Sequence, residues 1–127
     1  MPQTFAKTEH LKRQNAIDAL FAAGNKFMAY PFRVVYTLVA RQPDMPPAQA
    51  MVVVRKKLFR HAVDRNRYKR LLREAYRLHK QPLFDALSNT PHTMHIAFLA
   101  VGDTLPDFRT VERQMVAAID RLTTAVE

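Results

Sequence analysis

The chain has 127 residues, 48% of them apolar and 24% charged, as is typical of one folded domain. This length excludes a large two-lobed cofactor enzyme, and the absence of cysteine excludes disulfide frameworks, thiolate metal sites and cysteine nucleophiles. No apolar run approaches the roughly 20 residues that span a bilayer, and the first residues lack a secretion signal. We therefore expect a cytoplasmic protein with no membrane partner. Twenty basic residues against eleven acidic ones give a net charge of +9, which favours a polyanionic partner.

The periodicity of apolar residues predicts three helices and three strands, in the order helix, strand, strand, helix, strand, helix. Their expected ranges are 14–23, 32–40, 48–55, 62–79, 93–101 and 108–126. We expect one domain over residues 1–127, with a flexible arm over residues 1–12.

Glycines and prolines predict how these elements end. Gly24 is expected to close the first helix in the left-handed conformation, and Gly102 plays the same part after the last strand. Three prolines between the first two strands cannot continue either strand, so we expect the two strands to form an antiparallel hairpin with a long connection.

The positive charge is concentrated in residues 55–80. This segment holds eleven of the twenty basic residues and two of the eleven acidic ones, so it carries +9 and the other 101 residues sum to zero. Lysines and arginines that served only solubility would be scattered among acids. The pattern therefore predicts a neutral body with one cationic element.

The helix expected over 62–79 separates apolar from cationic side chains. At 100° per residue, one arc holds Tyr68, Leu71, Leu72, Ala75 and Leu78. The opposite arc holds Arg65, Asn66, Lys69, Arg70, Arg73 and Arg77. Like charges at this spacing repel each other by roughly 0.2–0.5 kcal/mol per pair, a cost that a bound polyanion would offset. The preference for arginine over lysine favours bidentate and stacking contacts with phosphates and bases.

No residue group predicts catalysis or metal binding by the protein itself. Asp103 and Asp107 flank a turn, where N-cap and turn roles are the common ones. His92 and His95 are three apart on an expected strand, whereas a shared face needs a spacing of two. We expect no catalytic residue, no metal site and no phosphate-binding glycine loop.

Residues 65–76, preceded by residues 54–57 and 62–63, resemble the RNR motif of the bacterial ribonuclease P protein subunit. The N-terminal part is also similar, in Leu11-Lys12, Ile17, Leu20-Phe21, Gly24 and residues 32–38 with Tyr36. The resemblance covers about residues 11–80, and the last third matches in its strand-then-helix pattern. Ile17 stands where some members carry an aromatic residue, and residues 55–61 differ from the shorter loop with a serine and a glycine that other members have.

The resemblance implies a fold of the α/β (α+β) class. This fold is a single-domain sandwich with a sheet of four or fewer strands and a left-handed β-α-β crossover. The general preference for such crossovers is strongly right-handed, so only the resemblance supports this expectation.

The resemblance also implies a subunit that binds the catalytic RNA and the 5′ leader of precursor tRNA and assists removal of that leader. The RNA performs the chemistry with Mg²⁺ at its own active site, and the protein binds no cofactor alone. A one-to-one complex and a monomeric free protein are expected. By this resemblance, the residues expected to bind the catalytic RNA are Lys56, Lys57, Arg60, Arg65, Asn66, Arg67, Lys69, Arg70, Arg73 and Arg77. The residues expected to line the leader-binding cleft are Ile17, Phe21, Phe32 and Tyr36.

Two other function classes fit the charge pattern alone. One is a structural RNA-binding protein of ribosomal type, which has a basic helix and no substrate cleft. The other is a DNA-binding protein, which would usually show a helix-turn-helix or a dimerisation device, and neither is visible. The combination of Arg65-Asn66-Arg67 with Phe21 and Tyr36 favours the ribonuclease P subunit.

Overall fold

The computed structural model of the protein describes residues 5–126. Its helical elements are the 3-10 turn η1 (Lys7–Glu9), α1 (Gln14–Ala23), α2 (Ala62–His79), α3 (Gln81–Ser88) and α4 (Phe108–Val126). Its strands are β1 (Asn25–Ala29), β2 (Phe32–Ala40), β3 (Ala48–Val53) and β4 (His92–Ala100). The six expected elements are confirmed to within two residues at each end, and η1, β1 and α3 were not predicted.

The two longer missed elements have separate physical causes. Strand β1 is short and lacks β-branched residues, and it forms because it pairs along its whole length with β2, from Asn25 opposite Tyr36 to Ala29 opposite Phe32. Helix α3 contains Pro82, and proline is usually a signal that a helix has ended. Proline is tolerated in the first turn of a helix, where its missing N–H has no intrahelical partner in any case.

The sheet has the strand order β1-β2-β4-β3. Strand β4 therefore separates β2 from β3, pairing antiparallel with the first and parallel with the second, and the expected β2–β3 hairpin is wrong. The proline-rich connection instead reaches past the start of β4. There the Thr93 hydroxyl donates to the Pro46 carbonyl at 2.9 Å and the Met94 amide donates to the Pro47 carbonyl at 3.0 Å.

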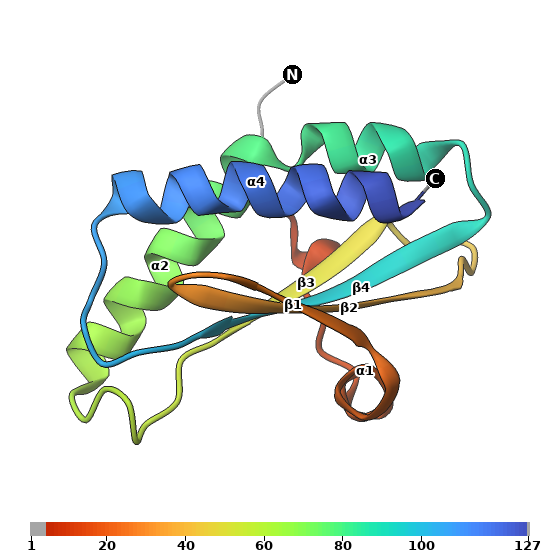
Figure 1. Ribbon diagram of the computed structural model, residues 1–127. Coiled ribbons are helices and arrows are strands. Elements are labelled where there is room, and N and C mark those ends of the chain that lie inside the picture. Colours follow the sequence, from red (N-terminus) through yellow and green to blue (C-terminus); the bar gives the residue numbers. More distant parts are fainter. Residues whose placement is uncertain (1–4, 127) are drawn as a thin grey trace.

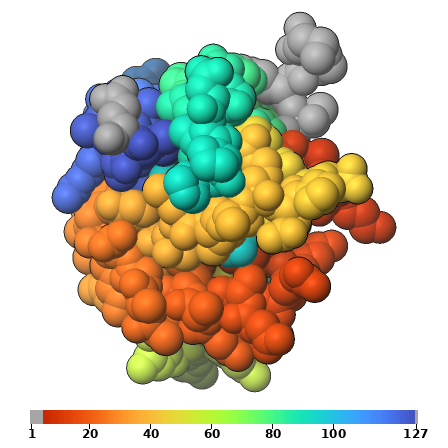
Figure 2. All heavy atoms as spheres, turned by 90° about the vertical axis from the view of Figure 1, so that its right-hand side faces the viewer, coloured from red at the N-terminus to blue at the C-terminus, as the bar shows by residue number. Residues whose placement is uncertain are grey.

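The parallel neighbours β3 and β4 are joined through α2 and α3. Figures 1 and 2 place both helices above the sheet and β3 on the far side of β4 in the view of Figure 1. Seen from the helices with both strands pointing up, β4 lies to the left of β3. The crossover is therefore left-handed, against the general preference.

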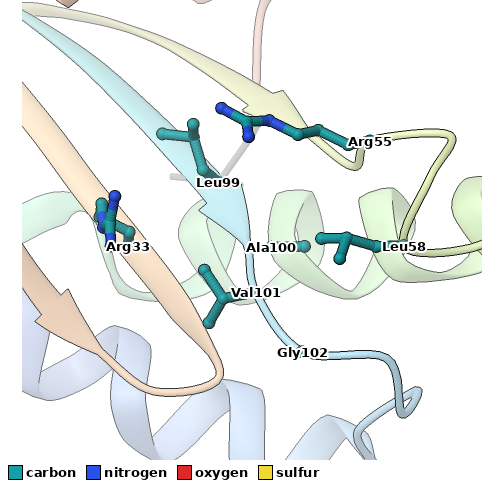
Figure 3. A pocket seen from close by; sticks show the side chains of 7 residues that line it. All are labelled: Arg33, Arg55, Leu58, Leu99, Ala100, Val101 and Gly102. Atoms are coloured by element: carbon teal, nitrogen blue, oxygen red, sulfur yellow. The ribbon is translucent and has the colours of Figure 1, made fainter.

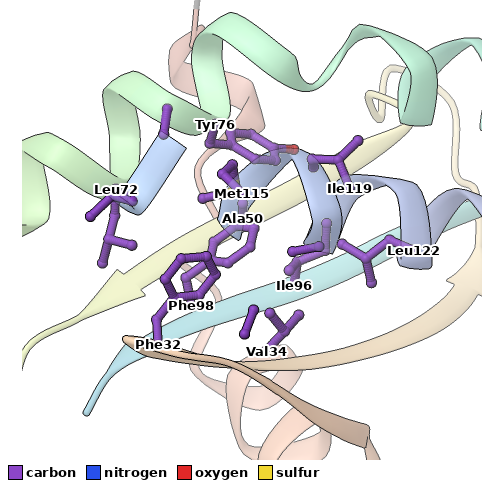
Figure 4. Packing of buried hydrophobic residues seen from close by; sticks show 14 of the residues in the cluster. Phe32, Val34, Ala50, Leu72, Tyr76, Ile96, Phe98, Met115, Ile119 and Leu122 are labelled. Atoms are coloured by element: carbon purple, nitrogen blue, oxygen red, sulfur yellow. The ribbon is translucent and has the colours of Figure 1, made fainter. Parts of the chain in front are cut away.

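Helices cover the two faces of the sheet unequally (Figure 1). Helices α2, α3 and α4 cover one face, called here the helical face, and α1 alone crosses the other, called the open face. The main core fills the helical face and includes Phe32, Val34, Ala50, Leu72, Tyr76, Ile96, Phe98, Met115, Ile119 and Leu122 (Figure 4). A smaller cluster under α1 is formed by Leu11, Leu20, Val35 and Ala97.

Residues 5–11, called here the N-terminal strap, pass around the edge strand β3. His10 forms a parallel bridge with Ala50, and the Leu11 amide donates to the Ala50 carbonyl at 2.9 Å. The Glu9 carboxylate forms a buried ion pair with the Lys80 ammonium. Residues 5–11 of the expected flexible arm make these contacts, and residues 1–4 lie outside the described part of the chain.

The two glycines have different roles. Gly102 has a φ of +81°, as expected for a left-handed residue after β4. Gly24 has a φ of −70°, so its predicted left-handed conformation is wrong. Space explains glycine at this position, because an added Cβ would lie 2.4 Å from the Leu20 carbonyl oxygen and 2.9 Å from the Val35 side chain.

Candidate nucleic-acid interface

Helix α2 separates a packed side from a charged one, as its spacing predicts. Tyr68, Leu72 and Ala75 are fully buried, while Leu71 and Leu78 are half-buried. The sequence analysis missed Tyr76, which is also fully buried. Tyr76 lies between two rings from outside the helix, Phe98 of β4 at 5.5 Å and Phe5 of the N-terminal strap at 5.2 Å. The helical period could not reveal this contact, because Phe5 is more than seventy residues away in the chain.

The charged side of α2 is open to solvent. Asn66, Arg67, Arg70 and Arg73 are exposed and Lys69 is half-exposed. Within residues 5–126, the structure shows no hydrogen bond or ion pair to any of these five side chains. We call them the cationic face of α2. Its guanidinium groups are therefore free to meet phosphates or bases of a ligand.

Two cations of the 55–80 segment are neutralised within the protein. The Arg77 guanidinium donates to the Glu74 carboxylate at 2.5 Å, and this hydrogen bond lowers the pKa of Glu74 and raises that of Arg77. The Lys80 ammonium is buried against Glu9, with 6% and 11% of the two side chains exposed. Arg77 was expected to contact RNA, but in the structure its guanidinium is bonded to Glu74 of the same helix.

Arg65 positions the loop before α2. Its guanidinium donates to the Phe59 carbonyl at 2.8 Å and to the Arg60 carbonyl at 3.0 Å. The Phe59 ring is buried against the Tyr68 ring, with a centroid distance of 5.5 Å. These contacts fix the course of a loop that the sequence left open. They hold the exposed side chains of Lys56, Lys57 and Arg60 near the start of the helix.

The four residues expected to form one cleft lie on two faces of the sheet. Ile17 and Phe21 are half-buried on α1 and pack against the small cluster of the open face. Phe32 is fully buried in the main core, 5.8 Å from the Phe98 ring, so in this structure it lines no surface. Tyr36 is half-buried on the helical face, where it meets the Phe27 ring at 6.0 Å. Side chains alternate along a strand, so residues 32, 34 and 36 face away from α1.

The open face instead has a hollow that the sequence analysis did not identify. Figure 3 shows Arg33 of β2 and Arg55 after β3 on either side of Leu99 of β4. Leu58, Ala100, Val101 and Gly102 complete the lining of this hollow, which has a volume of about 230 Å³. Arg33 lies between buried Phe32 and Val34, so the period of two could have assigned it to the open face.

Acidic and histidine residues serve structural roles here. The Asp107 carboxylate accepts the Thr110 amide at 2.8 Å at the start of α4, which lowers its pKa and confirms the expected N-cap. His95 is buried against the Gln49 side chain at 3.1 Å, and burial lowers the pKa of His95. Among residues 5–126, no three His, Asp or Glu side chains lie close enough together to hold a metal ion. No helix in that range has the length and apolar character to cross a bilayer.

Comparisons with known proteins agree with this geometry. Residues 5–123 match the sequence model of the family described as Ribonuclease P. A protein named ribonuclease P protein component, from Porphyromonas gingivalis, is 46% identical over 123 residues, which cover 95% of this chain and 89% of that one. A protein of the same name from Chlorobaculum tepidum is 35% identical over 119 residues, covering 85% and 77%.

Solved structures show the same fold at lower identity. The RNase P protein from Thermotoga maritima has a TM-score of 0.66 at 23% identity, covering 89% of this chain and 96% of that one. The Staphylococcus aureus RNase P protein has a TM-score of 0.58 at 18% identity, covering 94% and 95%.

Proposed function

Because the chain belongs to the ribonuclease P protein family and is a subunit of that tRNA-processing enzyme, we propose that it binds the catalytic RNA through the cationic face of α2 and its preceding loop. The observation that carries this proposal is the set of solvent-exposed guanidinium groups on a helix whose other side packs against the main core. RNA phosphates would relieve the mutual repulsion of these groups. The fold then acts as a scaffold that presents one charged surface.

The same proposal places the 5′ leader of precursor tRNA on the open face. Half-buried Ile17 and Phe21 on α1 offer apolar and ring surface to unstacked bases. Arg33 and Arg55 flank the neighbouring hollow and supply charge for the leader phosphates (Figure 3). Of the four residues expected for the cleft, Ile17 and Phe21 keep that role, and Arg33, Arg55 and Leu99 replace Phe32 and Tyr36.

We assign the chemistry and its Mg²⁺ ions to the RNA partner. The surface proposed to face the RNA is almost purely cationic, so it favours phosphates over divalent cations. A one-to-one complex with RNA is proposed, with a monomeric free protein. The exposed large apolar side chains support a monomer because they lie on separate elements and include Met28, Leu38, Val63 and Val116. The absence of cysteine agrees with a cytoplasmic location.

Reconstitution tests the function directly. The protein mixed with a bacterial ribonuclease P RNA at low magnesium is expected to restore 5′ maturation of precursor tRNA. The protein without RNA is expected to cut nothing, and cleavage by the protein alone would show that the assigned role is wrong. Binding without any gain in maturation would favour a structural RNA-binding protein.

Single substitutions separate the two surfaces. Arg70→Ala should weaken binding to the catalytic RNA and reduce the slope of log affinity against log salt by about one, because one phosphate contact is lost. Arg113→Ala on α4 removes another exposed arginine, from outside the proposed surface, and serves as the matched control. Phe21→Ala should weaken binding of leader-bearing tRNA more than that of mature tRNA. Equal losses for the two tRNAs would contradict the leader assignment.

A further inference from the structure

A second hollow lies between the N-terminal strap and α2. It is lined by Phe5 and His10 of the strap and by Asn66, Arg70, Arg73, Glu74 and Arg77 of the helix. Its volume is about 470 Å³. Neither surface assigned above includes the strap.

The floor of this hollow is a stack of aromatic rings. The Phe5 and His10 rings are parallel to within 11°, with centroids 3.9 Å apart. Behind Phe5 lies the buried Tyr76 ring, tilted by 59° with its centroid 5.2 Å away. Phe5 and His10 are only half-buried, so part of the ring surface remains accessible. Accessible ring surface of this kind is what unstacked RNA bases bind.

The wall of the hollow supplies groups for a phosphate and for a base edge. Arg70 and Arg73 are exposed and have no partner within residues 5–126. Exposed Asn66 offers both a donor and an acceptor, which guanidinium groups do not. Glu74 is already held by Arg77, so its carboxylate does not neutralise the two open arginines. Ring surface beside open guanidinium groups fits a nucleotide better than it fits a simple anion.

Buried contacts hold the strap in place before any ligand arrives. Glu9 pairs with buried Lys80, and a second oxygen of the same carboxylate accepts the Ala6 amide at 3.2 Å. On the other side of the ring stack, the Leu11 amide is bonded to β3. The segment between the two rings and the residue after His10 are therefore both anchored. A preorganised site loses less conformational entropy when it binds its ligand.

We propose that this hollow captures one unpaired nucleotide of the catalytic RNA, with the base on the Phe5–His10 rings and its phosphate on Arg70 and Arg73. The proposal rests on the proposed function, since it needs the catalytic RNA as partner. It extends the contact surface from the cationic helix to the strap. Duplex RNA does not fit the role, because a paired base cannot leave its stack to reach the rings.

Substitution of His10 tests the stacking contact. His10→Ala should weaken affinity for the catalytic RNA by about fivefold or more, the size expected from loss of one base–ring stack. His10→Phe keeps a ring at this position and should retain affinity. His92→Ala removes a histidine from the far end of the sheet, where the side chain is exposed, and should have no effect. Circular dichroism and urea unfolding confirm that each variant is folded.

The outcomes separate this inference from the proposed function. Unchanged affinity in His10→Ala overturns the inference, and so does equal weakening in His10→Ala and His10→Phe, which would indicate an imidazole-specific contact. In both cases the wild-type protein would still bind the RNA and support maturation. Failure of the wild-type protein to do either would refute the proposed function instead.

A double-mutant cycle tests whether the rings and arginines hold the same nucleotide. Loss of either contact should loosen the nucleotide from the other, so His10→Ala with Arg73→Ala should weaken binding by less than the product of the single effects. Independent, multiplicative effects would overturn the shared-nucleotide arrangement.

Cross-linking locates the nucleotide, because the chain has no native cysteine. Thr8→Cys places one thiol on the exposed part of the strap, where an attached photoreactive group should cross-link to an unpaired nucleotide of the catalytic RNA. Thr124→Cys on α4 is the control and should give no such product. Cross-links only to paired RNA, or only to the leader, would overturn the proposal.

Discussion

The two faces of the sheet differ in how completely they are covered. Within residues 5–126, the helical face buries a cluster of twenty-two residues, while the open face buries four under α1. The first is a protein core, which stabilises the fold through apolar burial. The second leaves half-buried apolar side chains beside Arg33 and Arg55, an arrangement suited to a ligand with bases and phosphates. Stability and leader binding are therefore assigned to opposite sides of one sheet.

The strongest test exchanges a phenylalanine for alanine on each face. Phe98 is fully buried and contacts the Phe32 and Tyr76 rings, so Phe98→Ala should lower the free energy of unfolding by about 3–5 kcal/mol. Phe21 is half-buried and packs only against the small cluster of the open face. Phe21→Ala should therefore lower the free energy of unfolding by about 1.5 kcal/mol or less. Urea denaturation monitored by circular dichroism measures both. Equal losses would show that the open face is part of the core.

The buried ion pair tests how the two faces are connected. Glu9 and Lys80 fasten the N-terminal strap, which leads directly into α1, to the helical face. Glu9→Gln should lower the free energy of unfolding by about 3 kcal/mol, because it removes the buried carboxylate charge that pairs with the Lys80 ammonium. Thermal or urea unfolding gives the value.

A matched control exists at the surface. Glu112 pairs with His79 at 2.9 Å, with 37% and 31% of the side chains exposed, and Glu112→Gln should cost less than about 1 kcal/mol. If both variants lose the same stability, burial of the Glu9–Lys80 pair has no special role. In that case the strap would not couple the two faces.

Local pattern was enough to predict most elements of this fold and the charged side of α2. Helical spacing separates Leu72 and Ala75 from Arg70 and Arg73 without knowledge of any other element. The order of the strands was not predictable in this way. Pairing β3 with β4 rather than β2 depends on the α2–α3 crossover, a long-range arrangement that no local spacing encodes.

The leader cleft shows a second limit of the sequence. The resemblance places Phe32 and Tyr36 in one cleft with Phe21, whereas the strand period of two puts these two residues on the opposite face of the sheet from Arg33. Tyr76 lies four residues after Leu72 and eight after Tyr68, so helical spacing alone could have placed it on the packed side. The strap hollow could not be predicted from spacing, because it depends on Phe5 folding back over α2, and Phe5 is far away in the chain.

Two buried tyrosines on α2 differ in whether their hydroxyl groups have a hydrogen-bond partner. Tyr68 and Tyr76 are both fully buried, and burial raises the pKa of each phenol. The Tyr68 hydroxyl donates to the Pro31 carbonyl at 2.6 Å, whereas the Tyr76 hydroxyl has no partner within residues 5–126. Tyr68→Phe should therefore cost about 1 kcal/mol of unfolding free energy, and Tyr76→Phe should be neutral or stabilising. A loss at Tyr76→Phe equal to that at Tyr68→Phe would contradict this difference.

The smallest expected effect is at His95, whose protonation tests whether water reaches the open face near the strap. Burial against Gln49 lowers the pKa of His95, so in a window below its usual value of about 6.5 the unfolded chain binds more protons than the folded one. His95 therefore contributes stability that is complete above that value and is lost as pH falls through the window, by less than about 1.4 kcal/mol per pH unit. His95→Gln should reduce the loss of stability between pH 7 and pH 5, measured by urea denaturation at each pH. An unchanged pH dependence would mean that His95 is already protonated without cost in the folded protein, and that water reaches the open face beneath the strap.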